Sequence, residues 1–325
     1  MSMIEATNFT QIVYEHIQEK RSMGCRFNKQ AQVLDRIITL QDSIDHGRPC
    51  LSRELADQWI QKTPWENETN HGHRISILRG LSLFMARLGY TTVPIPQRLF
   101  PWNSVSYCPT IFSDRELGAL LKAVDQLGTQ SKGLSMAIVF PVVFRILVGC
   151  GTRISETLHI EKRDLDLELG CVLLRFTKND KQRVIPIASS IIDRLRNYLD
   201  LAKHFPGLDS SPLLFANRDG KAYSNETAYR HFRSALHLAG ISHGGKGKGP
   251  RLHDLRHTYA VRVLNKWVKD GNNLTTALPY LAVYMGHSGL RASERYLRLT
   301  VTMFPDLVKA AEDSYDWVIP EAHHG

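Results

Sequence analysis

Hydrophobic residues recur every three or four positions along the first part of the chain. This spacing predicts amphipathic helices, because residues i, i+3 and i+4 lie on one face of an α-helix. The pattern is clearest at 73–88, where Ile75, Leu78, Leu81 and Met85 follow it. We expect helices at 12–21, 30–45, 52–61 and 73–88.

The pattern changes after residue 92. Residues 92–112 hold four prolines and no helical period, which predicts an extended linker. Ser113 and Glu116 then form a capping box that opens a helix through Leu127, and a mostly apolar helix is expected at 134–148.

Two short segments further on have strand character, 171–176 and 183–187, and the polar turn between them predicts a hairpin. Helical patterns make up most of the rest. We therefore expect a mainly α fold with a small β-sheet (α+β). A helical domain at 1–92 is followed by a linker at 93–112 and a larger α+β domain at 113–325.

Composition narrows the functional class. The 43% hydrophobic and 22% charged residues are typical of a globular protein and argue against a disordered, collagen-like or polytopic membrane chain. Lys and Arg number 41 against 32 Asp and Glu, a formal charge of +9 that favours a polyanionic partner, nucleic acid first and an anionic membrane second. Five scattered cysteines without a C-x-x-C, and no signal peptide, favour free thiols in the cytoplasm.

The segment LHDLRHT at 252–258 leads into a helical pattern. His253, Arg256 and His257 are spaced i, i+3 and i+4, so a helix would present them on one face. A guanidinium binds phosphate oxygens bidentately, and an imidazole transfers protons near neutral pH. The pattern therefore indicates phosphoryl chemistry, and an ordinary polar helix face is the alternative.

Three other features matter only in combination. Arg153 in GTRISE has Glu156 at a distance that would orient it, or the two form a simple buried ion pair. Lys178 in the hairpin turn would reach into a groove, or is an ordinary solvated lysine. Tyr296 follows His287 of MGHS by nine positions, and a tyrosine on such a helix is usually a packing residue.

Together and in this order, these features resemble the tyrosine recombinases, the phage-integrase and Xer-type site-specific recombinases. The matching segments are GTRISE, the lysine in TKNDKQRVIPI, LHDLRHT, MGHS and the tyrosine nine residues after His287. The resemblance covers residues 113–310 by motif, and residues 10–90 more weakly as the family's helical DNA-clamping domain.

The resemblance implies which residues transfer protons. Tyr296 is the nucleophile, His253 accepts its proton, and Lys178 is the general acid for the leaving 5′ oxygen. A tyrosine hydroxyl has a pKa near ~10 and needs a base or a strong positive field to attack at pH 7. The alkoxide is a poor leaving group, so it needs an acid.

The resemblance also implies which residues bind the phosphate. Arg153 and Arg256 clamp its non-bridging oxygens, His287 supports it, and Glu156 steadies Arg153. Two arginines neutralise the charge that develops during attack. The covalent phosphotyrosine keeps the energy of the broken bond, so strands can be rejoined without ATP. With six catalytic groups at the site, we expect no metal and no other cofactor.

The implied substrate and assembly follow from the family. We expect a clamp around double-stranded DNA with an inverted-repeat core site, a homodimer on each site and a tetramer in the synapse. The implied pathway runs through a 3′-phosphotyrosine and a Holliday junction. It serves integration, excision or transposition of a mobile element, at the nucleoid, with accessory or element-encoded proteins as possible partners and no membrane.

Weaker signals concern DNA contacts and the position of the nucleophile. Basic residues near the fourth helix and in the glycine-rich loop at 243–251 are candidate DNA contacts, with a solvated polar surface as the alternative: His73, Arg74, Arg79, Lys246, Lys248 and Arg251. Arg256 and Tyr296 are 40 positions apart, which leaves open whether Tyr296 acts in its own or a neighbouring subunit. Relaxation of DNA as in type IB topoisomerases, and DNA binding without catalysis, are the rival functions.

Overall fold

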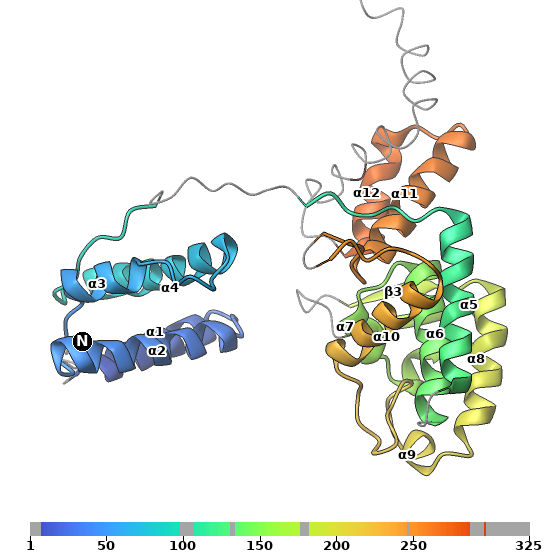
Figure 1. Cartoon of the computed structure of the whole chain (residues 1–325), viewed down its shortest axis with the longest axis horizontal. Helices are drawn as coiled ribbons and strands as arrows, with labels where there is room; N and C mark the ends of the chain where they lie inside the picture. The colour runs from blue at the N-terminus through green and yellow to red at the C-terminus, as the bar shows by residue number, and fades with distance from the viewer. Residues whose placement is uncertain are drawn as a thin grey trace, which may run out of the picture. The chain divides into compact units, whose positions relative to one another are not determined.

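The computed structural model describes residues 8–97, 107–130, 134–175, 182–245, 248–286 and 296. The chain divides into two compact units, Met1–Tyr107 and Cys108–Gly325 (Figure 1). Each unit has its own hydrophobic core. The division falls inside the proline-containing segment that the sequence analysis assigns to a linker.

The first unit is built from helices, as predicted. They are α1 (Phe9–Ser22), α2 (Asn28–Asp45), α3 (Arg53–Ile60) and α4 (Glu68–Arg87). Helix α4 starts five residues before the predicted position, because the side chain of Asn67 accepts a hydrogen bond from the backbone N–H of Asn70 and caps an additional turn. The four apolar faces meet in one core.

Helix α6 (Leu134–Cys150) lies at the centre of the second unit. It packs against α5 (Asp114–Gln130), α8 (Ser189–Ala202) and α11 (Asp254–Lys269). Its one charged residue, Arg145, donates to both carboxylate oxygens of Asp125 and to the carbonyl of Pro141. The apolar stretch is therefore a core helix, as predicted, and none of the described helices is long and apolar enough to cross a membrane.

The start of α5 confirms the predicted capping box. The backbone N–H of Glu116 donates to the hydroxyl oxygen of Ser113 at 3.3 Å. The Glu116 carboxylate accepts from the Ser113 N–H at 2.8 Å. The helix continues to Gln130, three residues beyond the predicted end.

The predicted hairpin is present and belongs to a sheet of order β1-β2-β3. Its strands are β1 (Leu165–Asp166), β2 (Cys171–Leu174) and β3 (Arg183–Pro186), all antiparallel, with Leu174 opposite Arg183. Strand β1 was not predicted, because two residues are too few to show an alternating pattern. Lys178, in the predicted turn, lies outside the described residues.

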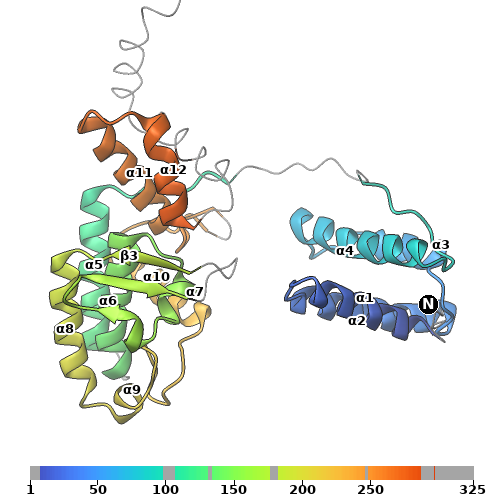
Figure 2. The ribbon, with the colours of Figure 1, turned by 180° about the vertical axis from the view of Figure 1, so that it is seen from behind.

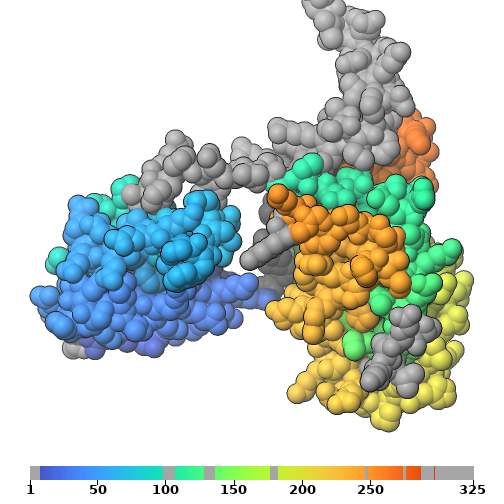
Figure 3. All heavy atoms as spheres, in the orientation of Figure 1, coloured from blue at the N-terminus to red at the C-terminus, as the bar shows by residue number. Residues whose placement is uncertain are grey.

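The sheet and α10 (Asn225–Leu238) lie on opposite sides of α6. Helix α10 is in front of the second unit in Figure 1, and the sheet is in front when the molecule is turned round in Figure 2. The space-filling view shows α10 beside the green atoms of α5, which it contacts (Figure 3). The remaining short elements are α7 (Ile154–Leu158), the 3₁₀ helix η1 (Lys162–Asp164) and α9 (Pro206–Asp209).

A separate small core joins α11 to α12 (Leu274–Met285). Its buried members include Ala260 and Leu264 of α11, Leu281 and Met285 of α12, and Tyr296. The last helix described therefore ends close to the residues that the LHDLRHT motif contributes from α11.

Candidate active site

The turn between α6 and α7 is built around a glycine. Gly151 has a φ of 60°, which favours glycine, and an added Cβ would lie 2.3 Å from ring carbon Cδ1 of Tyr259. The turn places Arg153 at the N-cap of α7. Glu156, three residues later, accepts hydrogen bonds from the Arg153 backbone N–H at 3.1 Å and from its Nη1 at 2.6 Å. The structure thus brings Arg153 and Glu156 together.

A second arginine binds the same carboxylate. Arg183, the first residue of β3, donates from Nη1 and Nη2 to the two Glu156 oxygens at 3.2 and 2.8 Å. Arg183 is not among the site residues that the motifs predict. A signal was present, because strand alternation puts Arg183 on the same face as buried Ile185, and an arginine facing inward needs an anionic partner.

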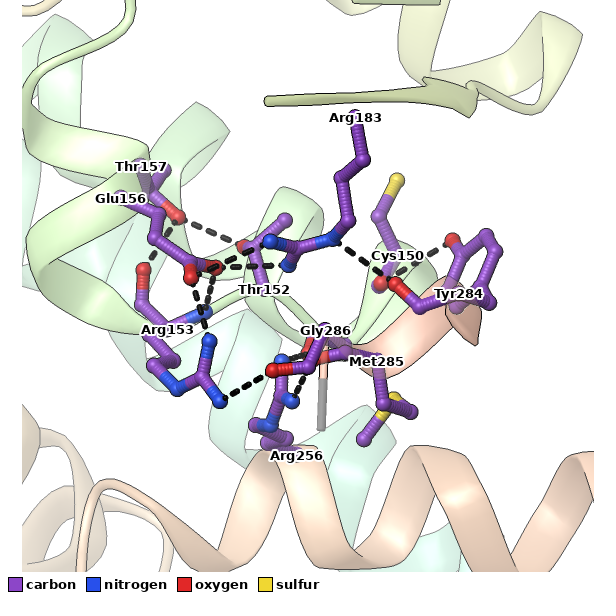
Figure 4. A network of polar contacts seen from close by, with 11 residues as sticks. Cys150, Thr152, Arg153, Glu156, Thr157, Arg183, Arg256, Tyr284, Met285 and Gly286 are labelled. Atoms are coloured by element: carbon purple, nitrogen blue, oxygen red, sulfur yellow. Dashed lines mark hydrogen bonds and ion pairs between the residues drawn. The ribbon is translucent and has the colours of Figure 1, made fainter. Parts of the chain in front are cut away.

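Three arginines converge on the C-terminal end of α12 (Figure 4). The carbonyl of Tyr284 accepts from Arg183 Nε at 2.8 Å, and the carbonyl of Gly286 accepts from Arg153 Nη2 at 3.1 Å. The carbonyl between them, of Met285, accepts from Arg256 Nη2. The last carbonyls of a helix have no partner within it and carry partial negative charge, so they hold cations well.

Arg256 reaches this cluster from the first turn of α11. It is 2% exposed, and its Nη1 donates to the carbonyl of Gly151 at 2.8 Å. Burial, followed by the charge of Arg153, lowers the pKa of Arg256 to about 10, so the guanidinium remains charged at neutral pH. The two predicted clamp arginines therefore contact adjacent carbonyls of one helix end.

His253 is the N-cap of α11. Burial, followed by the charges of Arg256 and Arg153, lowers its pKa to about 4. The imidazole is therefore neutral at pH 7 and has a lone pair that accepts a proton. An anion beside the two arginines would oppose their effect and make the imidazole a stronger base.

Tyr296 is buried next to the histidines of α11. Its ring centroid is 5.5 Å from that of His257, which is 4.8 Å from that of His253. Only 2% of Tyr296 is exposed. The structure thus lines up three residues of the predicted motifs, while His287 lies outside the described residues, as Lys178 does.

The candidate DNA contacts in the first unit have different surroundings. His73 is exposed. Arg74 is buried: it pairs with Glu66, donates to the carbonyls of Trp59 and Gln61, and lies over the Trp59 ring. We correct its assignment as a DNA contact, because these bonds use its guanidinium to join α3 to α4.

The other candidate DNA contacts are more accessible or tied to loops. Arg79 donates to the carbonyls of Ile95 and Pro96 and so holds the chain after α4. Lys248 and Arg251 are exposed just before His253, and Lys246 lies outside the described residues. Within the described ranges, no three His, Cys, Asp or Glu residues gather in a way that would hold a metal ion.

Comparison with known proteins gives consistent results. Residues 111–303 match the phage integrase family. The putative integrase/recombinase y4rB of Sinorhizobium fredii is 25% identical over 307 residues, covering 94% of this chain and 96% of its own. Tyrosine recombinase XerD of Mycobacterium leprae is 27% identical over 229 residues, covering 69% and 67%. A structure of the XerH site-specific recombinase bound to palindromic difH substrate, a post-cleavage complex, aligns with a TM-score of 0.65 at 20% identity, covering 95% and 85%.

Proposed function

The chain belongs to the phage integrase family, and from that premise we propose that it is a site-specific DNA recombinase with Tyr296 as its nucleophile. One observation carries the proposal. Arg153 and Arg256 bind neighbouring carbonyls at the end of α12, beside a neutral His253 on the helix against which Tyr296 packs. A diester phosphate needs this combination of fixed cations, a proton acceptor and a hydroxyl nucleophile.

The proposed reaction is a transesterification. One phosphodiester bond breaks as another forms, so the energy of the broken bond is kept in the new one. The Tyr296 oxygen attacks the scissile phosphorus while His253 takes the hydroxyl proton. Arg153 and Arg256 donate to the non-bridging oxygens. The bond to the 5′ oxygen breaks, Lys178 protonates that oxygen, and a 3′-phosphotyrosine forms. A 5′ hydroxyl from a partner strand reverses these steps.

The supporting residues act on the phosphate and its arginines. Glu156 fixes Arg153 through two hydrogen bonds, one from the Arg153 backbone N–H and one from its Nη1. His287 would add a further donor to the phosphate. Because the covalent intermediate conserves the phosphoester bond, rejoining needs no ATP, and the arginines, histidines and Lys178 would supply the charge stabilisation and proton transfer that a metal ion would otherwise provide.

The proposed substrate is double-stranded DNA with an inverted-repeat core, bound by a dimer at each site and by a tetramer in the synapse. The palindromic DNA of the XerH complex supports this arrangement, since a two-fold protein pair fits a two-fold site. The similarity to y4rB, which is named as an integrase/recombinase, supports movement of a genetic element, with strand exchange through a Holliday junction and action at the nucleoid. Exposed Lys248 and Arg251 would contact the DNA backbone.

A covalent-trapping assay tests the proposal. The protein is incubated in EDTA with nicked suicide duplexes taken from the flanks of its own gene, beside Tyr296→Phe. We expect an adduct that survives denaturation and is absent from Tyr296→Phe. An adduct that persists in Tyr296→Phe would assign the nucleophile to another tyrosine.

Strand exchange between two marked duplexes then separates recombination from its rivals. Exchanged products are expected if the chain is a recombinase. Relaxation of supercoiled DNA without exchange would indicate a topoisomerase-like activity, and specific binding without any adduct would indicate a non-catalytic DNA-binding protein.

A further inference from the structure

We propose that Arg183 is a positioning residue of this site. It balances the buried negative charge of Glu156, so that Glu156 does not neutralise Arg153 and the positive charge of Arg153 can act on the scissile phosphate. The inference rests on the proposed function. It concerns a residue in the same segment as Lys178, but one to which the resemblance assigns no role and which acts only through Glu156 and Arg153.

Arg183 and Arg153 bind the same carboxylate but differ in their other contacts and in their exposure. All three nitrogens of the Arg183 guanidinium are used inside the protein, two on Glu156 and one on the carbonyl of Tyr284. Its side chain is 11% exposed, whereas that of Arg153 is 20% exposed. Arg183 is thus the inner counterion of Glu156, and Arg153 is the one nearer to solvent.

Charge counting shows why the second arginine matters. Arg153, Arg183 and Arg256 supply three positive charges around the single negative charge of Glu156, whose side chain is 1% exposed. Without Arg183, the carboxylate would have Arg153 as its remaining ion-pair partner at this site. In a site of low polarity such a pair attracts an incoming phosphate far less than an arginine whose carboxylate is shared.

Arg183 also fixes the second acceptor of Arg153. It holds the carbonyl of Tyr284 in the last turn of α12, two residues before the Gly286 carbonyl that accepts from Arg153. Gly286 has a φ of 63°, and an added Cβ would lie 2.9 Å from Arg183 Nη1. The Arg183 side chain is therefore packed directly against the residue that orients Arg153.

The test compares four variants with the full-length wild type. They are Arg183→Gln, Arg183→Lys, the double variant Glu156→Gln with Arg183→Gln, and the matched control Arg145→Gln. Arg145 of α6 makes a comparable set of bonds, two to the carboxylate of Asp125 in α5 and one to the carbonyl of Pro141 in its own helix. Each protein reacts once with saturating suicide DNA. The rate constant of adduct formation is recorded separately from the final amount and from the DNA affinity.

We expect Arg183→Gln to lower the rate constant by roughly 10- to 100-fold, with DNA affinity changed less than about threefold. This is less than the roughly 100- to 1,000-fold for loss of a direct contact to the developing charge, because Arg183 acts through Glu156 and Arg153. Arg183→Lys keeps the charge and should retain more activity. The double variant should react about tenfold faster than Arg183→Gln, because the neutral amide that replaces the Glu156 carboxylate no longer neutralises Arg153. Arg145→Gln should lower the amount of active protein and leave the rate constant unchanged.

Each outcome is decisive. If Arg183→Gln reacts as fast as Arg145→Gln, or if the double variant is slower than Arg183→Gln, Arg183 has only a structural role and the inference is wrong. If wild type forms no adduct that depends on Tyr296, the proposed function itself fails, and this inference fails with it. A wild-type adduct with unaffected Arg183 variants overturns the inference alone.

Discussion

Replacing Glu156 with glutamine measures how much the buried carboxylate contributes to folding. Four N–H donors bind its two oxygens: the Arg153 backbone N–H, Arg153 Nη1, Arg183 Nη1 and Arg183 Nη2. Glutamine keeps one acceptor oxygen and turns an NH₂ group toward an arginine donor. The change therefore leaves buried positive charge without its counterion.

The magnitude follows from the burial. Removing one partner of a buried ion pair costs about 3–5 kcal/mol. We take the lower end, about 3 kcal/mol, because Arg153 retains some contact with solvent. For a cooperative unit the size of the second one, this predicts a fall in Tm of roughly 6–12 °C.

The assay is thermal unfolding of the full chain by calorimetry, with Glu116→Gln as the matched control. Glu116 occupies the same capping-box position, but on the surface-facing start of α5, so its replacement should cost less than ~1 kcal/mol. The reasoning would be refuted if Glu156→Gln unfolded within ~1 kcal/mol of wild type.

The pH dependence gives a second check on the same variant. Burial acts to raise the pKa of Glu156, but the hydrogen bonds and charge of Arg183, followed by Arg153, outweigh it and lower the pKa. A carboxyl group with a lowered pKa stabilises the fold above its unfolded pKa, near ~4.3, and loses this contribution as pH falls through the folded value. The Tm difference between wild type and Glu156→Gln should therefore narrow in acid; a widening difference would contradict the assigned contacts.

Three further predictions address neighbouring features. Gly151→Ala should lower the free energy of unfolding by more than ~2 kcal/mol, because the added Cβ would clash with the Tyr259 ring and the backbone has a positive φ. Gly118→Ala, whose Cβ would meet open space within α5, should not destabilise the fold, and chemical denaturation compares the two. Tyr284→Phe should cost about 1–2 kcal/mol in the same assay, since it removes the hydroxyl that donates to the last carbonyl of α6 and hydrogen-bonds with the Tyr259 side chain, and a loss above ~3 kcal/mol would point to a larger role. In the DNA-free protein the His253 ring should stay neutral at pH 6, because burial and then two arginines lower its pKa to about 4; ring-nitrogen NMR shifts with a midpoint near ~6.5 would contradict this.

The sequence by itself determined the secondary structure of most of the described chain and the kind of chemistry to look for. Hydrophobic periodicity located the helices of the first unit and the central helix α6, and polar capping residues located the start of α5. The ordered motifs around Arg153 and Arg256 predicted the family to which the chain belongs. The helices and their caps are local, so a single stretch of residues reveals each of them, whereas the family follows from the order of several motifs along the chain.

Only the tertiary structure decided which groups meet at the site. Arg183 donates to a carbonyl 101 positions away and Arg153 to one 133 positions away. Every residue has a backbone carbonyl, so the sequence does not show which one an arginine will bind. The same holds for Arg74. The sequence predicted it on a DNA-facing surface, but in the structure it is buried and donates to the carbonyls of Trp59 and Gln61 at the end of α3. A side chain's charge can be read from its letter, but its partners depend on how distant segments fold together, because hydrogen bonds form between atoms that are close in space.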